Sequence, residues 1–203
     1  FRMSKHNSPT PALFLDRDGT VIVDKIYLSD PNGIDIIPGA ADSIRSINRI
    51  GWKVVIVSNQ SGIARGMYSE KDCDAVNDEL SRRLKTLGAV IDAVYYCPYH
   101  KDGTVEKYAK ESNDRKPAPG MAFRAAADLG IDMSKSWMIG DRADDIRFAL
   151  NAGMSGAVLV ETGQGWTDEN KSAVDALAAE TKRMTVLRSP DIEIGRASCR
   201  ERV

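Results

Sequence analysis

Five short apolar runs that each end abruptly in polar residues restrict the fold of this 203-residue sequence more than any other feature. They span residues 12–15, 53–57, 93–96, 136–139 and 157–160. A strand of a parallel sheet typically reads as such a run, because helices cover both of its faces. The segments between the runs have helical periodicity, so strands and helices alternate. We therefore predict a Rossmann-like three-layer α/β/α sandwich with a mostly parallel central sheet.

Apolar residues at steps of three or four positions predict amphipathic helices between these runs. The predicted helices span about 41–50, 69–87, 121–129 and 144–152, and a glycine follows each. Ser69 begins the second helix, and Asp72 three residues later completes a capping box. Residues 163–191 are polar and favour one further helix and strand.

Charge and apolar content exclude several classes of protein. The 28 Lys and Arg residues are balanced by 29 Asp and Glu residues, which argues against a main partner that is a nucleic acid or an anionic membrane. The apolar runs are far shorter than the roughly 18 residues of a membrane-spanning helix. The three cysteines show no disulfide spacing, and the first residues lack the apolar stretch of a secretory signal. We expect a cytoplasmic protein.

The two ends of the sequence need separate treatment. Residues 194–203 resemble the translation of a sequencing adapter, so we expect a non-native tail there. Residues 1–193 are expected to form a single domain, with 1–10 as a disordered arm. The tail contains three Arg and one Glu, so the rest of the chain carries a net charge of −3.

Polar residues that could take part in catalysis or binding follow four of the predicted strands. They are Asp16 and Asp18, then Ser58, then Arg115 and Lys116, and then Asp141. Alone, each feature is typical of a turn, a loop or a helix start. Because ligands of such sheets bind beyond the carboxyl ends of the strands, we expect these side chains to lie close together.

Together these residues suit phosphoryl transfer. Clustered aspartates repel each other, so we expect a hard divalent cation, and an all-oxygen ligand set suits Mg²⁺. The cation and Lys116 would neutralise a phosphoryl group, and Ser58 would donate a hydrogen bond to it. Asp16 could then attack phosphorus, while Asp18 protonates the leaving alkoxide and later deprotonates water.

The segment 16–20, Ser58, Lys116 and the Gly140-Asp141 pair with Asp145 resemble the four motifs of the haloacid dehalogenase (HAD) superfamily of phosphohydrolases. The longer run 57–66, together with 14–24, 95–98, 115–117 and 119–121, resembles the branch of the D-glycero-D-manno-heptose 1,7-bisphosphate 7-phosphatases. Histidinol-phosphate phosphatases are close relatives of that branch. The resemblance covers about residues 12–163. It implies a HAD-like fold with a minimal, loop-only cap, and a monomer that acts on a small sugar phosphate of lipopolysaccharide core synthesis.

The resemblance also implies roles for individual residues. Asp16 is the expected nucleophile and Asp18 the expected acid and base. Mg²⁺ is expected on the Asp16 and Asp141 side chains and the Asp18 carbonyl, with Asp145 behind these ligands. Ser58 and Lys116 are expected to stabilise the phosphoryl group, and Arg115 to bind the second phosphate. The remaining expected substrate contacts are Asp24, Lys25, Ile26, Tyr27, Asn59, Gln60, Ser61 and Arg142, the last at a position where a lysine is usual.

One departure from the branch concerns zinc. Many members bind Zn²⁺ through a Cys-x-His pair and a later Cys-x-Cys pair, but this sequence keeps only Cys97. The other three positions are replaced by Tyr99, Ser112 and Asp114. Zn²⁺ is therefore not expected, although Cys97, His100 and Asp114 leave an irregular three-ligand site open. We predict that packing orders the loop 98–114, with Tyr96, Tyr99 and Tyr108 as the candidate contacts.

Four alternative functions remain open at this point. A histidinol-phosphate phosphatase would share the Asp16 chemistry, but Arg115 favours a bisphosphate substrate. A polynucleotide 3′-phosphatase would need a basic groove, which the charge of −3 disfavours. A receiver-like signalling module must preserve its phosphoaspartate, so Asp18 beside Asp16 disfavours it. A catalytically inactive phospho-ligand binding protein would carry the same motifs.

Overall fold

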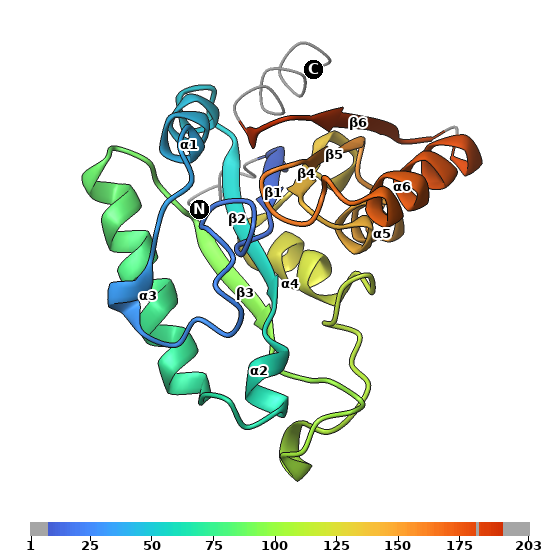
Figure 1. The fold of residues 1–203 in the computed structure, drawn as a ribbon. Helices are drawn as coiled ribbons and strands as arrows, with labels where there is room; N and C mark the ends of the chain where they lie inside the picture. Colours follow the sequence, from blue (N-terminus) through green and yellow to red (C-terminus); the bar gives the residue numbers. More distant parts are fainter. Residues whose placement is uncertain (1–7, 182, 193–203) are drawn as a thin grey trace, which may run out of the picture.

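The protein is built around a fully parallel six-stranded sheet. The computed structural model describes residues 8–181 and 183–192, so the predicted non-native tail and residues 1–7 lie outside the described part. The strands lie in the order β3-β2-β1-β4-β5-β6, and each pair is parallel (Figure 1). Their bounds are β1 Ala12–Leu15, β2 Lys53–Asn59, β3 Ala93–Cys97, β4 Trp137–Gly140, β5 Gly156–Val160 and β6 Thr185–Ser189.

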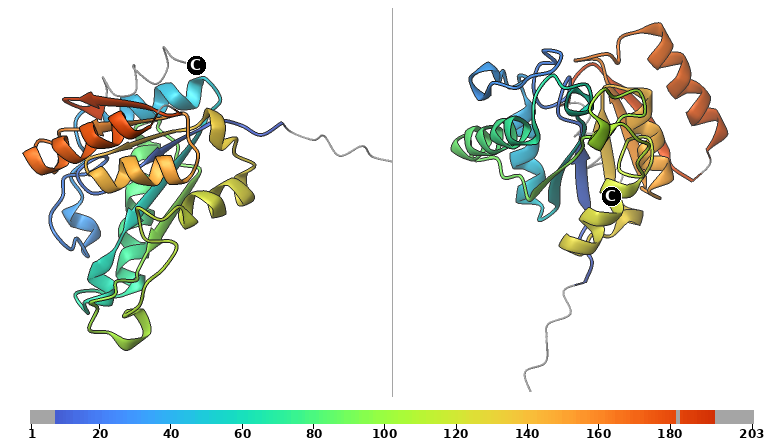
Figure 2. Two further views of the ribbon diagram at one scale, coloured as in Figure 1. Left: turned by 90° about the vertical axis from the view of Figure 1, so that its right-hand side faces the viewer. Right: turned by 90° about the horizontal axis from the view of Figure 1, so that it is seen from below.

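Helices cover both faces of this sheet, which gives the predicted three layers. Two helices lie on one face, α1 (Ala40–Arg49) and α3 (Glu70–Thr86), and three lie on the opposite face (Figure 2). That second group comprises α4 (Gly120–Leu129), α5 (Ala143–Asn151) and α6 (Asp168–Glu180). A one-turn helix, α2 (Ser61–Ala64), directly follows β2. Three short 3₁₀ helices span Pro31–Gly33, Glu106–Tyr108 and Met133–Lys135.

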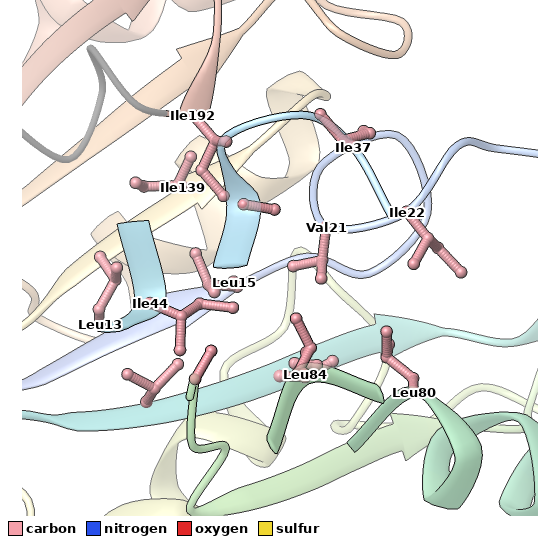
Figure 3. Packing of buried hydrophobic residues seen from close by; sticks show 14 of the residues in the cluster. Leu13, Leu15, Val21, Ile22, Ile37, Ile44, Leu80, Leu84, Ile139 and Ile192 are labelled. Atoms are coloured by element: carbon pink, nitrogen blue, oxygen red, sulfur yellow. The ribbon is translucent and has the colours of Figure 1, made fainter. Parts of the chain in front are cut away.

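Alternate residues of the strands point into two separate cores. In β1, Leu13 and Leu15 belong to the core under α1 and α3, while Ala12 and Phe14 belong to the core under α4, α5 and α6. Figure 3 shows the first of these cores, where Leu13 and Leu15 pack with Ile44 of α1 and with Leu80 and Leu84 of α3. This period of two is the reason why the strand runs are apolar at every position.

The predicted fold class is confirmed, and most predicted boundaries differ from the structure by one or two residues. The capping box of α3 is present, with the Ser69 side chain accepting from the Asp72 amide and the Asp72 side chain accepting from the Ser69 amide. The predicted arm 1–10 was too long by at least one residue. Thr10 forms an isolated bridge to Ile131, because its amide donates to the Gly130 carbonyl and its carbonyl accepts from the Asp132 amide.

The carboxyl ends of all six strands lie at one edge of the sheet, because the strands are parallel. The loops after β1, β2, β3 and β4 therefore meet there, as the sequence pattern predicts. The segment 16–39 after β1 is tied back by a bridge between Ile22 and Ile36, and it contains only one short 3₁₀ helix. Within the described residues, no helix is both long and apolar enough to span a membrane.

Candidate active site

A polar cleft opens at this edge of the sheet. Its walls come from the loop after β1, the end of β2 with α2, the segment before α4, and the start of α5. Of the residues predicted for the site, those that line the cleft are Asp16, Asp18, Asp24, Ile26, Tyr27, Ser58, Asn59, Gln60, Ser61, Arg115, Lys116, Arg142 and Asp145. Four strand ends thus contribute to one cavity, as expected.

The Lys116 ammonium group forms the floor of this cleft. Its Nζ atom lies 2.6 Å from Asp16 Oδ1, 2.6 Å from Asp145 Oδ1 and 2.9 Å from the Val57 carbonyl. All three donor hydrogens are therefore used. The side chain of Asn59 holds the Lys116 backbone from both sides, at 2.9 Å from its amide and 3.0 Å from its carbonyl. Asn59 was predicted to contact substrate, and its amide is largely committed to this contact.

Burial and charge act together on the ionisation of this group. Burial lowers the pKa of Lys116, but the carboxylates of Asp145 and Asp16 outweigh that effect and raise it above its ordinary value. Burial also raises the pKa of Asp16 well above its usual range, and the neighbouring carboxylates Asp145 and Asp141 add to this while Lys116 opposes it. The local charge is therefore too negative for one lysine to balance.

A cation fits this excess of negative charge. Asp16, Asp141 and Asp145 offer carboxylate oxygens that lie within 4.8 Å of one another. Asp141 is fully buried, and its Oδ1 atom has no hydrogen-bond partner among the described residues. A buried carboxylate oxygen without a donor is costly, so the site suits a metal ligand there. Three carboxylates and one ammonium leave two negative charges, which a divalent ion such as Mg²⁺ would balance.

Two glycines give Asp141 the room it needs. A Cβ atom on Gly19 would lie 2.4 Å from Asp141 Oδ2, and one on Gly163 would lie 2.1 Å from it. Gly19 also has a φ of +86°, which favours glycine. The same Asp141 oxygen, Oδ2, accepts a 2.7 Å hydrogen bond from the Gln164 amide. Burial, followed by the charge of Asp145, raises the pKa of Asp141 to about 6.

Asp145 is held by protein donors on both oxygens. Oδ1 accepts from Lys116 and Oδ2 accepts from the Arg142 backbone amide at 3.0 Å. Gly140 makes this approach possible, because a Cβ there would lie 2.3 Å from the Asp145 carboxyl carbon. These contacts fit the predicted place of Asp145 behind the metal ligands, where it anchors Lys116.

The Asp18 carboxylate lies in a network that the sequence did not predict. Arg17, which is 1% exposed, bonds to both Asp18 oxygens through Nε and Nη2. The remaining Arg17 nitrogen, Nη1, donates to Asn77 Oδ1 of α3 at 2.8 Å. On the other side, Gln60 Nε2 donates to Asp18 Oδ2 at 2.9 Å. The alternation in 16–18 places Arg17 on the opposite side from Asp16, but no sequence signal connected it to Asn77.

Two arginines line the outer part of the cleft. Arg115 is half-buried, and burial is the main cause that lowers its pKa. Its Nη1 atom lies 3.5 Å from the Tyr99 carbonyl, so its guanidinium is only lightly held. Arg142 faces the loop after β1 and pairs with Asp24 at 3.5 Å. Both guanidinium groups are therefore available to an anionic ligand that enters the cleft.

The loop 24–28 has an unusual backbone. Ile26 and Tyr27 both have positive φ values, 48° and 64°, which are rare for a β-branched or aromatic residue. The Asp24 side chain accepts from the Ile26 amide at 3.0 Å and supports this turn. Lys25 does not line the cleft, contrary to its predicted contact with substrate. Its ammonium turns away and pairs with Asp35 at 2.5 Å.

The loop 98–114 contains a 3₁₀ helix and is packed around two tyrosines. The Tyr99 and Tyr108 rings lie 6.0 Å apart, and the amides of Thr104 and Val105 both donate to the Ala64 carbonyl of α2. The prediction that Tyr96 joins these contacts was wrong. Tyr96 alternates with Tyr95 along β3, so it faces α3, where its hydroxyl donates to Asp74 at 2.8 Å.

The candidate zinc ligands do not form a close group of three in this loop. Within the described residues, the three aspartates around Lys116 are the one group whose ligand atoms are close enough to share a metal. Asp114 pairs with Arg124 at 3.3 Å, and His100 lies beside Arg65. Burial raises the pKa of the Cys97 thiol, and its sulfur lies 3.8 Å from the Tyr99 carbonyl. Cys97 therefore resembles a small buried apolar residue here.

Comparison with known proteins identifies the family. Residues 113–184 match a family model of HAD-hydrolase-like proteins. A D-glycero-beta-D-manno-heptose-1,7-bisphosphate 7-phosphatase of Yersinia pestis is 41% identical over 165 residues, which cover 81% of this chain and 88% of that protein. The chain belongs to this family of HAD-like hydrolases. The resemblance predicted from the motifs is thereby confirmed.

Further members of the family support the assignment. The 7-phosphatase of the same name from Escherichia coli K12 is 39% identical and covers 81% of this chain and 86% of its own length. A D,D-heptose 1,7-bisphosphate phosphatase from B. bronchiseptica, solved with magnesium and phosphate, superposes with a TM-score of 0.78 at 28% identity. It covers 96% of this chain and 100% of that one. The Burkholderia thailandensis enzyme gives 0.62 at 26% identity, over 95% and 97% of the two chains.

Removal of the buried ammonium should destabilise the protein in a pH-dependent way. Lys116→Met leaves Asp16 and Asp145 buried without a counter-charge, and we expect a loss of about 3–5 kcal/mol in the free energy of unfolding at pH 8. The variant should bind protons on these carboxylates in the folded state, so the loss should shrink toward pH 5. Urea unfolding at both pH values measures this difference.

The exposed Lys135, which pairs with Asp132 at 3.4 Å, offers a matched control. Lys135→Met should change the free energy of unfolding by less than about 0.5 kcal/mol at either pH. A loss in Lys116→Met that is the same at pH 5 and pH 8 would contradict the proposed charge balance.

Magnesium should stabilise the folded protein through Asp141. At a Mg²⁺ concentration about 100 times the Kd, we expect a gain of about 2.7 kcal/mol, visible as a rise in Tm. Asp141→Asn should abolish this rise, whereas Asp144→Asn, in the first turn of α5, should retain it. Because the pKa of Asp141 is about 6, protons should compete with the metal and the rise should diminish below that pH. An equal rise in Tm with Mg²⁺ in both variants would exclude Asp141 as a ligand of the metal.

Proposed function

We propose that the protein is a Mg²⁺-dependent phosphatase that removes the 7-phosphate from D-glycero-β-D-manno-heptose 1,7-bisphosphate. The observation that carries the proposal is the Asp16 carboxylate, held 2.6 Å from Lys116 at the floor of a cleft lined by Asp18 and Ser58. The 41% identity to a named 7-phosphatase over 81% of the chain supports the choice of substrate. Activity as a monomer is part of the proposal, as the family resemblance implies.

Mg²⁺ would be held by the carboxylates of Asp16 and Asp141 and by the carbonyl of Asp18. When bound, the ion supplies charge that offsets the repulsion between the Asp16 carboxylate and the incoming phosphate. Lys116 supplies a second positive charge from below, and the Ser58 hydroxyl donates to a phosphoryl oxygen. These groups are fixed before substrate arrives, because each is anchored on a strand end or by buried hydrogen bonds.

The reaction proceeds in two steps on Asp16. An Asp16 oxygen attacks the phosphorus atom, and the bond from phosphorus to the sugar oxygen breaks while Asp18, protonated, gives its proton to that oxygen. In the second step Asp18, now a carboxylate, takes a proton from water. The water oxygen attacks phosphorus, the bond to Asp16 breaks, and inorganic phosphate leaves.

The two arginines at the cleft provide for the second phosphate group. Arg115 enters from the segment before α4 and Arg142 from the start of α5, and both line the cleft with Lys116. A guanidinium group binds phosphate oxygens through two parallel hydrogen bonds. Arg115 is therefore assigned to the non-reacting phosphate, with Arg142 and the loop 24–27 around the sugar.

Phosphate release from the purified protein tests this proposal. With Mg²⁺, heptose 1,7-bisphosphate should be hydrolysed with a higher kcat/KM than histidinol phosphate, and EDTA should abolish the reaction. Asp16→Asn should be inactive because it lacks the nucleophile, and Asp18→Asn should lose about 10²–10⁴-fold in kcat. A preference for histidinol phosphate would retain the mechanism and reject the substrate. A protein that releases no phosphate would instead be a binding module.

Arg115→Ala separates the two phosphates of the substrate. Its KM for the bisphosphate should rise by about tenfold or more, as expected for the loss of a charge-assisted contact. Its kcat/KM for a monophosphate ester should stay near that of the wild type. A similar loss on both esters would place Arg115 at the reacting phosphate.

We further propose that the loop 98–114 is ordered without zinc. Cys97, His100 and Asp114 do not form a group of ligand atoms close enough to share a metal, and the Tyr99–Tyr108 contact packs the loop, which supports this. Metal analysis of the purified enzyme should give well below one Zn per chain, and a chelator should leave the Tm unchanged once Mg²⁺ is restored. One stoichiometric Zn would refute the proposal.

A further inference from the structure

The side chain of Gln60 connects Asp18 through hydrogen bonds to Tyr68, a residue with no role in the reaction described above. Gln60 is only 3% exposed, and both ends of its amide are hydrogen-bonded. Nε2 donates to Asp18 Oδ2 at 2.9 Å and to Ser58 Oγ at 2.7 Å. Oε1 accepts from the hydroxyl of Tyr68. The sequence assigned Gln60 to the substrate, and it assigned nothing to Tyr68.

Tyr68 determines which way the Gln60 amide points. A buried primary amide can place either its oxygen or its nitrogen toward Asp18, and the oxygen would repel the carboxylate. The Tyr68 hydroxyl donates to Oε1, so the NH₂ group faces Asp18. Burial is the main cause that raises the pKa of Tyr68, so its hydroxyl keeps the proton that it donates.

The position of Tyr68 depends on residue 62 being a glycine, which has no side chain. A Cβ atom on Gly62 would lie 2.2 Å from Tyr68 Cε1 and 2.8 Å from Tyr27 Cδ1. The two rings therefore pack directly against the α2 backbone, which brings the Tyr68 hydroxyl to Gln60. Gly62 has no positive φ, so close approach is the reason that this position needs glycine.

We propose that Gln60 and Tyr68 are positioning residues that hold the Asp18 carboxyl group where it can deliver its proton to the leaving oxygen. Arg17 holds the carboxylate from the α3 side, and Gln60 holds it from the β2 side. The inference rests on the proposed role of Asp18 as the acid of the first step. Neither Gln60 nor Tyr68 is assigned a proton transfer of its own.

Leaving groups of different basicity test the proposal. An alkoxide needs the proton from Asp18 in order to leave, whereas 4-nitrophenolate leaves without it. The parameter kcat/KM reports the steps up to formation of the aspartyl phosphate. Tyr68→Phe should therefore lower kcat/KM for an alkyl phosphate by about tenfold, a part of the total acid contribution, and change that for 4-nitrophenyl phosphate by less than about twofold.

Tyr96→Phe provides the matched control. The Tyr96 hydroxyl also bonds to a side-chain oxygen, that of Asp74, but it lies on β3 away from the cleft. This variant should keep the wild-type kcat/KM on both esters. An equal loss on both esters in Tyr68→Phe would show a merely structural role and overturn the proposal, as would no loss on either.

A measurement without turnover tests the same contact. The side-chain amide resonances of Gln60, assigned by their absence in Gln60→Ala, should be protected from solvent exchange in the wild type and lose protection in Tyr68→Phe. Unchanged protection would overturn the proposal.

Failure of the proposed function has a different signature. If the wild type hydrolyses another alkyl phosphate in place of the heptose bisphosphate, the proposed substrate is wrong. The effect of Tyr68→Phe on kcat/KM is then measured for that ester and compared with the effect for 4-nitrophenyl phosphate. A protein with no phosphatase activity would overturn both proposals.

Discussion

The Lys116 ammonium group, enclosed by two carboxylates and a backbone carbonyl, links three parts of the chain. Asp16 follows β1, Val57 lies in β2, and Asp145 lies in α5, so a single side chain connects three segments at the carboxyl edge of the sheet. The cost of burying an ammonium is offset only when its partners are in place. The Asn59 amide then fixes the Lys116 backbone to the end of β2. Site geometry and local stability therefore depend on the same contacts.

The fold was predictable because its strongest determinant is local. The four inner strands β2, β1, β4 and β5 are buried on both faces, so their runs of apolar residues are visible in the sequence, as in Val54–Val57 of β2. The direction of the parallel strands predicted the meeting of Asp16, Ser58 and Lys116, and the motif resemblance added Asp145. The ends of elements were less predictable. Thr10 bridges to Ile131 through backbone bonds that any residue could make, so no side-chain pattern marked it.

The parts of the site that escaped prediction are contacts between elements. Asn77 lies on α3 and reaches Arg17 because of how that helix packs on the sheet, which periodicity does not specify. Tyr68 lies in a short connection before α3, and its role depends on the space above Gly62. Lys25 and Tyr96 were misplaced for a related reason. The turn of the backbone directs Lys25 toward Asp35 and not into the cleft. The alternation of side chains along β3 directs Tyr96 toward Asp74 of α3 and not toward the loop 98–114.

The separation of Lys116 from its partners has a consequence for how the chain acquires its fold. Lys116 and Asp16 are 100 positions apart, and Asp145 lies a further helix and strand beyond Lys116. During synthesis, the amino-terminal strands therefore emerge well before the ammonium and its second carboxylate. Contacts of such long range form late and slow the folding of parallel sheets. A nascent chain that ends before α5 would offer this lysine only one of its two carboxylate partners, so the buried contacts of Lys116 are completed only after α5 has emerged.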